Sequence, residues 1–104
     1  MIVIDAAMEA NDDAALKKLL PLLSAAAKET ATEKGCVKYQ FSIDIDNPRL
    51  IRINELWESE ADLFAHFQLV ATKPLIGQIG AMSRMAHMKA LKGDLTPLDL
   101  PIPS

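Results

Sequence analysis

The chain has few of the residues from which many protein sites are built. Its 104 residues include one cysteine, Cys36, and two histidines, His66 and His87. A single cysteine cannot form an internal disulfide, and so few thiol and imidazole ligands argue against a zinc cage. Aromatic residues make up only 5% of the chain. We therefore expect a core built mainly from aliphatic side chains and methionine.

Charge and hydropathy exclude further classes of protein. The net charge of -3 and the pI near 5.2 argue against nucleic acid or an anionic membrane surface as a partner. No apolar run approaches the roughly 18 residues of a transmembrane helix. The first residues, Met-Ile-Val-Ile-Asp, lack the basic segment of a secretory signal. The sequence predicts one soluble, cytoplasmic domain spanning residues 1–104.

Hydrophobic periodicity predicts a strand followed by a helix at the beginning of the chain. Residues 2–8 are typical of a short strand, and residues 13–33 carry apolar side chains at helical spacing. Asn11 is the expected N-cap and Gly35 the expected C-cap of this helix. Pro21 lies inside it, so we expect a kink there.

A hairpin and a second crossover should follow. Residues 36–43 and 50–57 both alternate with a period of two, and the Asp46-Asn47-Pro48 turn between them predicts an antiparallel pair. Ser59 is a natural N-cap for a helix in which Leu63, His66, Phe67 and Val70 share one stripe.

Pro74 should open a short second helical piece, and residues 84–92 should form the last strand. The resulting order is β-α-β-β-α-β, the ferredoxin-like α+β arrangement, in which the helices cover one face of an antiparallel sheet. The core should span about residues 1–93. The proline-rich segment 94–104, which ends with Pro103 before Ser104, should be an extended strap.

The hairpin strands carry apolar side chains on both faces, although the helices can cover only one. A second copy of the chain is the simplest cover for the other face. The sequence therefore predicts a homodimer that packs sheet against sheet.

The chemistry should lie where the third strand meets the following helix. Alternation places Glu55 and Trp57 on one strand face together with two isoleucines. A carboxylate there needs a partner or a raised pKa. His66 follows closely and could act as a general base, because a histidine ordinarily titrates near pH 6.5. Pairing of His66 with Asp62, one helical turn earlier, is the structural alternative.

Four segments resemble the antibiotic biosynthesis monooxygenase family, and the resemblance covers about residues 1–92. They are Gly35-Cys36-Val37-Lys38-Tyr39, Asp46-Asn47-Pro48, Asn54-Glu55-Leu56-Trp57-Glu58-Ser59-Glu60 and Ala65-His66-Phe67. The resemblance implies a dimeric α+β barrel with a cavity between sheet and helices in each subunit. It also implies oxygenation of an electron-rich phenol or quinol by dioxygen without flavin, haem or metal. In that chemistry the deprotonated substrate gives an electron directly to dioxygen.

The same resemblance assigns roles to individual residues. His66 would be the base and Glu55 would orient it. The substrate ring would be held between apolar walls formed by Trp57, Tyr39 and Phe67. Asn54 is a further candidate, either for the substrate or for the dimer face, because it lies on the opposite strand face from Trp57.

Two other functions fit the same residues. An isomerase or lyase could use the same base on a small α-hydroxy ketone, and a non-catalytic binding or regulatory module could use the same scaffold. Fold alone cannot choose among these functions.

Overall fold

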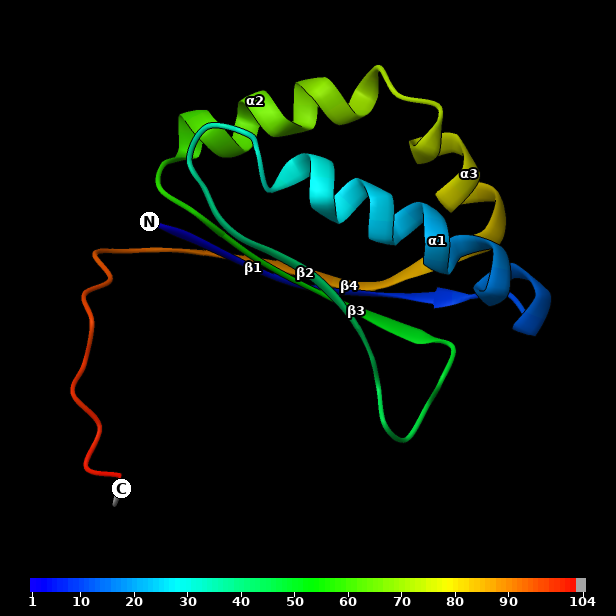
Figure 1. Cartoon of the computed structure of the whole chain (residues 1–104), viewed down its shortest axis with the longest axis horizontal. Coiled ribbons are helices and arrows are strands. Elements are labelled where there is room, and N and C mark those ends of the chain that lie inside the picture. Colours follow the sequence, from blue (N-terminus) through cyan, green and yellow to red (C-terminus); the bar gives the residue numbers. More distant parts are fainter. Residues whose placement is uncertain (103–104) are drawn as a thin grey trace.

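Strands and helices alternate along residues 1–102, the part of the chain that the computed structural model describes (Figure 1). The elements are β1 (Ile2–Ala10), α1 (Asp13–Thr30), β2 (Cys36–Ile43), β3 (Leu50–Trp57), α2 (Glu60–Ala71), α3 (Leu75–Met82) and β4 (Ser83–Lys92). The four strands form an antiparallel sheet in the order β2-β3-β1-β4. The helices lie on one side of this sheet. The predicted ferredoxin-like α+β fold is confirmed.

The core lies between α1 and the centre of the sheet. Strands β1 and β3 pair in a register that puts Ile4 opposite Glu55 and Ala6 opposite Ile53 on the helix side. From α1, Leu19 and Leu23 fill the space above them and are fully buried. Each such side chain contributes about 1.5–3 kcal/mol relative to an exposed one. The core is therefore mainly aliphatic.

The beginning of α1 differs from the prediction by one residue. Asp12, not Asn11, is the N-cap, since its Oδ1 accepts a 2.7 Å hydrogen bond from the backbone N–H of Ala15. Asn11 instead donates its side-chain amide to the carbonyl of Ala81. The helix continues through Pro21, which lies on its exposed face, where water can satisfy the carbonyl that loses its partner. Within residues 1–102, no helix is long and apolar enough to cross a bilayer.

Gly35 is not the C-cap of α1, because the helix already ends at Ala31 in the right-handed conformation. Gly35 has φ of 78° and lies in the turn before β2, where a Cβ would collide with Asp62. Asp62 is held in place by Ser59, whose Oγ donates to Asp62 Oδ2 at 2.9 Å and accepts from the Asp62 N–H at 3.1 Å. This geometry confirms Ser59 as the N-cap of α2. Gly35 is thus needed for the close approach of β2 to α2.

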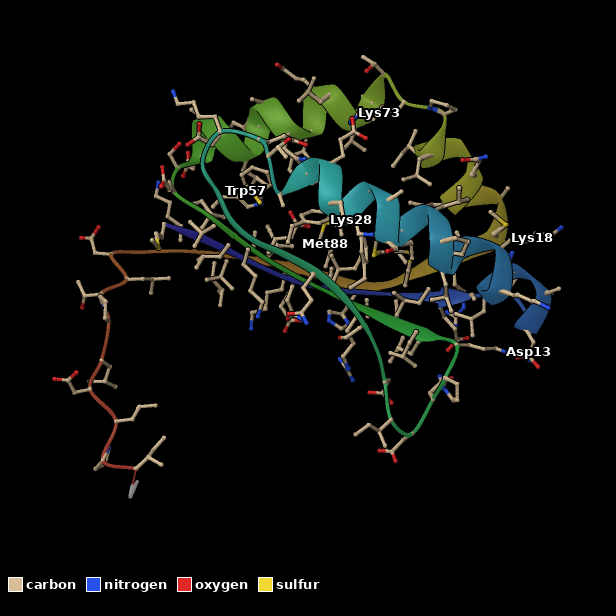
Figure 2. The ribbon with its side chains drawn as sticks, in the orientation of Figure 1. Asp13, Lys18, Lys28, Trp57, Lys73 and Met88 are labelled. Carbon is tan, nitrogen blue, oxygen red and sulfur yellow. The ribbon has the colours of Figure 1, made fainter. Side chains whose placement is uncertain are left out.

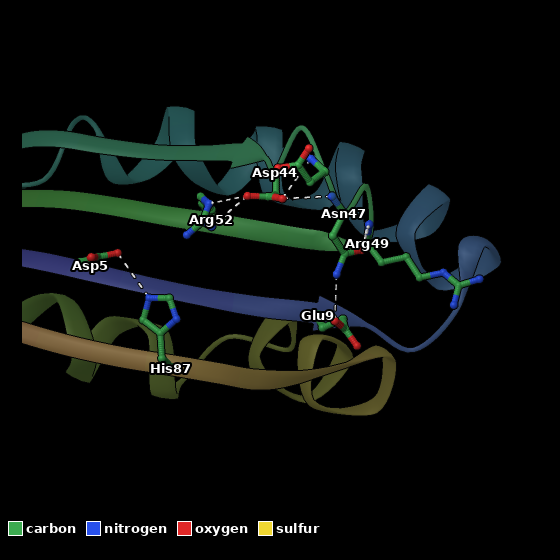
Figure 3. A network of polar contacts seen from close by, with 8 residues as sticks. Asp5, Glu9, Asp44, Asn47, Arg49, Arg52 and His87 are labelled. Carbon is green, nitrogen blue, oxygen red and sulfur yellow. Dashed lines mark hydrogen bonds and ion pairs between the residues drawn. The ribbon is translucent and has the colours of Figure 1, made fainter.

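The sheet face that turns away from the helices carries a network of polar contacts (Figure 3). Side chains from three of its strands and from the hairpin turn form pairs at 2.8–3.4 Å: Arg52 with Asp44, Arg84 and Asn47 with Glu9, and His87 with Asp5. Exposed pairs of this kind contribute little individually to stability, about 0–1 kcal/mol. We call this surface the open face.

Residues 94–102 form no helix or strand. They extend from the end of β4 to the side of the sheet opposite the helices (Figure 1). Four of their side chains are 49–80% exposed: Leu95, Leu98, Leu100 and Ile102. We call this segment the tail; its predicted continuation at Pro103 lies outside the described residues.

The turn at Gly35 yields a stability prediction. In Gly35→Ala, the positive φ costs about 1–2 kcal/mol, and the new methyl group must also displace the Asp62 side chain. We expect the midpoint of thermal unfolding, followed by circular dichroism, to fall by at least about 5 °C.

Gly77→Ala is the matched control for this change. Gly77 lies inside α3, and nothing lies within 4 Å of the position that its Cβ would occupy. Alanine should therefore stabilise the protein there by about 0.5–1 kcal/mol. Equal midpoints for the two variants would contradict the role assigned to Gly35.

Candidate functional site

The most deeply buried ionisable pair joins α2 to the turn that follows α1. His66 Nδ1 lies 2.9 Å from Glu33 Oε1, and the two side chains are 3% and 13% exposed. The sequence offered Glu55 and Asp62 as partners of this imidazole, but neither forms the hydrogen bond to its Nδ1. Asp62 instead bonds to Ser59 at the beginning of α2.

Three aromatic rings surround the imidazole. The ring centroids of Trp57, Tyr39 and Phe67 lie 4.9, 5.3 and 5.9 Å from that of His66. Trp57 has no exposed surface, whereas Phe67 is 42% exposed. Trp57 therefore supports the imidazole from within the core and offers no surface to a substrate. Phe67 is exposed and Tyr39 is partly buried, so solvent reaches the cluster from the side of these two rings.

Glu55 orients Trp57, not His66. Its Oε1 accepts a 2.9 Å hydrogen bond from the indole Nε1–H, and the residue is 7% exposed. Burial raises the pKa of Glu55, while the indole bond and the nearby His66 oppose this rise and the charge of Glu33 adds to it. The expectation that an acid on this face needs a partner or a raised pKa is met in both respects.

Glu33 is the site residue that sequence reasoning missed. Its second carboxylate oxygen, Oε2, is buried without a hydrogen-bond partner among residues 1–102. Burial raises the pKa of the neighbouring Cys36 thiol and Tyr39 hydroxyl, and the charges of Glu33 and Glu55 raise both further. Cys36 is therefore kept as a thiol, which argues against a nucleophilic role.

The helices leave part of β4 uncovered on their own side of the sheet. The register pairs Met88 with Ala6 and Met85 with Met8, so both β4 methionines point to the helix side. They are nevertheless 54% and 50% exposed. Figure 2 labels Met88 on the helix side of the sheet. Together these two side chains form what we call the methionine surface.

A separate groove of about 320 Å³ lies between α1 and β2. Tyr39 and Phe41 line its β2 side, and Leu20, Leu23 and Ala27 line its α1 side. Of the predicted site residues, only Tyr39 belongs to this lining. The groove therefore lies beside the histidine cluster and does not contain the imidazole.

Asn54 is not part of the cluster. In the sheet it is paired with Asp5 of β1 and Gln40 of β2, which places it on the open face. The alternation of β3 predicted this separation from Trp57. No contact between Asn54 and a substrate bound at His66 in the same subunit follows from this geometry.

The arrangement is suited to proton transfer. Because the Glu33 carboxylate can only accept, we assign the proton of the pair to His66 Nδ1, which leaves Nε2 as the basic nitrogen. A carboxylate also stabilises the imidazolium that forms when Nε2 takes a proton. Within residues 1–102, no group of three His, Cys, Asp or Glu side chains is arranged to hold a metal ion.

Known structures share this fold. The chain is similar to a candidate antibiotic biosynthesis monooxygenase from Deinococcus radiodurans, with 20% identity, a TM-score of 0.85, and coverage of 96% of this chain and 99% of that one. It is similar to a second antibiotic biosynthesis monooxygenase, with 25% identity, a TM-score of 0.72, and coverage of 93% and 100%. A conserved protein from Methanosarcina mazei Go1 shares 17% identity, a TM-score of 0.78, and coverage of 90% and 94%.

Sequence comparison identifies the family. No curated protein matches the chain. The family model for antibiotic biosynthesis monooxygenase matches residues 1–76, which include β1 to α2 and with them Glu33, Glu55, Trp57 and His66. The chain therefore belongs to the antibiotic biosynthesis monooxygenase family.

Proposed function

We propose that the protein is a cofactor-independent monooxygenase of a small aromatic or quinol-like substrate, with His66 as its general base. The observation that carries this proposal is the buried Glu33–His66 pair, enclosed by three aromatic rings. Membership of the monooxygenase family supports the same reading.

The proposed reaction begins with transfer of the substrate's phenolic proton to His66 Nε2. Glu33 balances the charge of the resulting imidazolium, so the pair changes from a net charge of −1 to neutral. The electron-rich substrate anion reduces dioxygen and combines with it to form a peroxide on the ring carbon. Proton return from His66 converts this peroxide to a hydroperoxide. His66 then takes the hydrogen of the same carbon, the O–O bond breaks to leave a carbonyl there, and the departing hydroxide takes that proton and leaves as water. The substrate supplies all the electrons, so this sequence needs no separate reductant.

We place the substrate on the Phe67 side of the imidazole, toward the methionine surface. Phe67, Met85 and Met88 are half-exposed apolar side chains of α2 and β4 on the helix side of the sheet. Methionine adapts its shape to an irregular apolar partner. Trp57 and Tyr39 then lie on the side of the imidazole away from the substrate. They fix the plane of the ring and exclude water that would protonate the substrate anion.

We further propose that two copies pack open face to open face. Family members are typically dimeric. On the open face, acidic Asp5 and Glu9 of β1 are flanked by basic Arg52 on β3 and Arg84 on β4. A two-fold-related copy can place its basic flanks near these acidic residues.

The base assignment makes a kinetic prediction. With a panel of quinols, the wild type should consume dioxygen, and His66→Gln should lower kcat by about 100-fold or more. Glu33→Gln preserves the shape of the partner but removes its charge. It should therefore lower kcat, because the imidazolium that forms during proton transfer has lost the negative charge beside it.

His87→Gln is the matched control, since it removes the other histidine, which lies on the open face beside Asp5. Its dioxygen consumption should equal that of the wild type. Unchanged turnover in a folded His66→Gln variant would refute the base assignment.

The same assays distinguish the alternative functions. If the protein consumes no dioxygen with any quinol but isomerises an α-hydroxy ketone, it is an isomerase and not an oxygenase. Tight ligand binding without turnover would instead identify a binding module.

Glu55 makes a prediction about stability. Glu55→Gln keeps an acceptor for the Trp57 Nε1–H, whereas Glu55→Leu leaves this buried donor unpaired at a cost of about 1–3 kcal/mol. Urea unfolding at pH 7 should therefore rank Glu55→Leu well below Glu55→Gln.

The pH dependence of this comparison has a defined sign. Burial raises the pKa of Glu55 above its ordinary value of 4.5, so its protonated form favours the folded state. The stability that this preference contributes is complete below pH 4.5 and is lost as the pH rises through the folded-state pKa. Wild type should thus lose stability relative to Glu55→Gln as the pH rises above about 4.5. A difference that does not change with pH would contradict the assignment.

A further inference from the structure

The tail has the chemistry of a segment that binds an apolar surface. In an extended segment, Leu98 and Leu100 point to one side and Asp99 to the other. Both leucines are more than half exposed, at 80% and 63%. Pro97 and Pro101 fix φ near −65°, which limits the freedom of the unbound tail and therefore the entropy that it loses on binding.

The groove between α1 and β2 is a matching surface. Leu20, Leu23 and Phe41 give it apolar walls, and Lys28 contributes a positive charge (Figure 2). Strand β2 is an edge of the sheet, so its outer backbone groups face no neighbouring strand. His66 does not belong to the lining. The groove therefore has the properties of a docking surface more than those of a catalytic centre.

The tail is poorly placed to fill the groove of its own subunit. It continues from β4, which lies at the opposite edge of the sheet from β2. It also leaves on the side away from the helices, whereas the groove lies on the helix side (Figure 1).

We propose that the tail of one copy docks in the α1–β2 groove of a second copy. Leu98 and Leu100 would enter the groove, and Asp99 would remain at its rim near Lys28 of the second copy. The inference rests on the face-to-face dimer of the proposed function but not on the oxygenase activity.

The geometry of such a dimer allows the tail of one copy to reach the groove of the other. If the two-fold axis runs parallel to the strands, the β4 edge of each copy lies over the β2 edge of the other. This arrangement brings the exposed edges of the two sheets together. Fully extended, residues 94–102 could span up to about 30 Å at roughly 3.3 Å per residue. Packed sheets are about 10 Å apart, so the tail can pass the partner's β2 edge and reach its helix side.

Disulfide trapping tests this contact. In a Cys36→Ser background, the combination of Leu98→Cys with Ser24→Cys puts one thiol on the tail and one in the groove lining. Mild oxidation should convert most of this protein to a covalent dimer on a non-reducing gel. The matched control replaces Ser24→Cys by Lys18→Cys, which is exposed on α1 but outside the groove lining (Figure 2). It should give at least about tenfold less covalent dimer.

Removal of the tail supplies a second measurement that needs no new thiol. Deletion of residues 94–104 should raise the dimer dissociation constant at least about tenfold in analytical ultracentrifugation. Ala27→Trp, which fills the groove of the full chain, should weaken the dimer in the same way.

Several results would overturn the proposal. These are a wild type that is monomeric, a disulfide within one chain, equal trapping by the control, or a tail deletion that leaves dimerisation unchanged. Trapping in a protein that does not consume dioxygen would keep this proposal and reject the oxygenase. Dioxygen consumption without trapping would keep the oxygenase and reject the docking of the tail.

Discussion

The hydrogen bond between Glu33 and His66 is the interaction on which the candidate site depends. It joins the turn after α1 to the middle of α2 and places the imidazole between Trp57 and Tyr39. The bond carries a cost in folding free energy, because it buries a carboxylate whose Oε2 has no hydrogen-bond partner within residues 1–102. An aliphatic pair would serve packing alone at least as well. This imbalance favours a chemical role for the pair over a purely structural one.

The elements of the fold could be predicted because their signals are local. A period of two over residues 36–43 and 50–57 specifies strands, and the turn between them specifies their pairing. The ends of α1 were less predictable, because Asn11 and Asp12 are both good capping residues. Only the packing against α3, which engages the Asn11 amide, decides between them. Gly35 followed a helical stretch as a C-cap does, but its positive φ serves the contact with Asp62 instead.

The site could be predicted only in part, for a related reason. Alternation along β3 correctly put Glu55 and Trp57 on one face and Asn54 on the other. It could not reveal that the Glu55 carboxylate is taken by the indole, because side-chain direction along a strand does not determine hydrogen-bond partners. Glu33 lies 33 residues from His66 in a turn without periodicity. The fold alone brings these two side chains together, so no local pattern could have identified Glu33.

The sheet separates two tasks between its faces. The helix side carries the imidazole, its carboxylate and the aromatic rings, in an environment where burial strengthens electrostatic interactions. The open face carries exposed ion pairs, which are weak individually but can discriminate between partner surfaces through their pattern of charge. Since β3 contributes Glu55 and Trp57 to one face and Arg52 and Asn54 to the other, a shift of its register by one residue would exchange both sets. The register of β3 therefore couples the proposed chemistry to the proposed assembly, even though no side chain of that strand serves both.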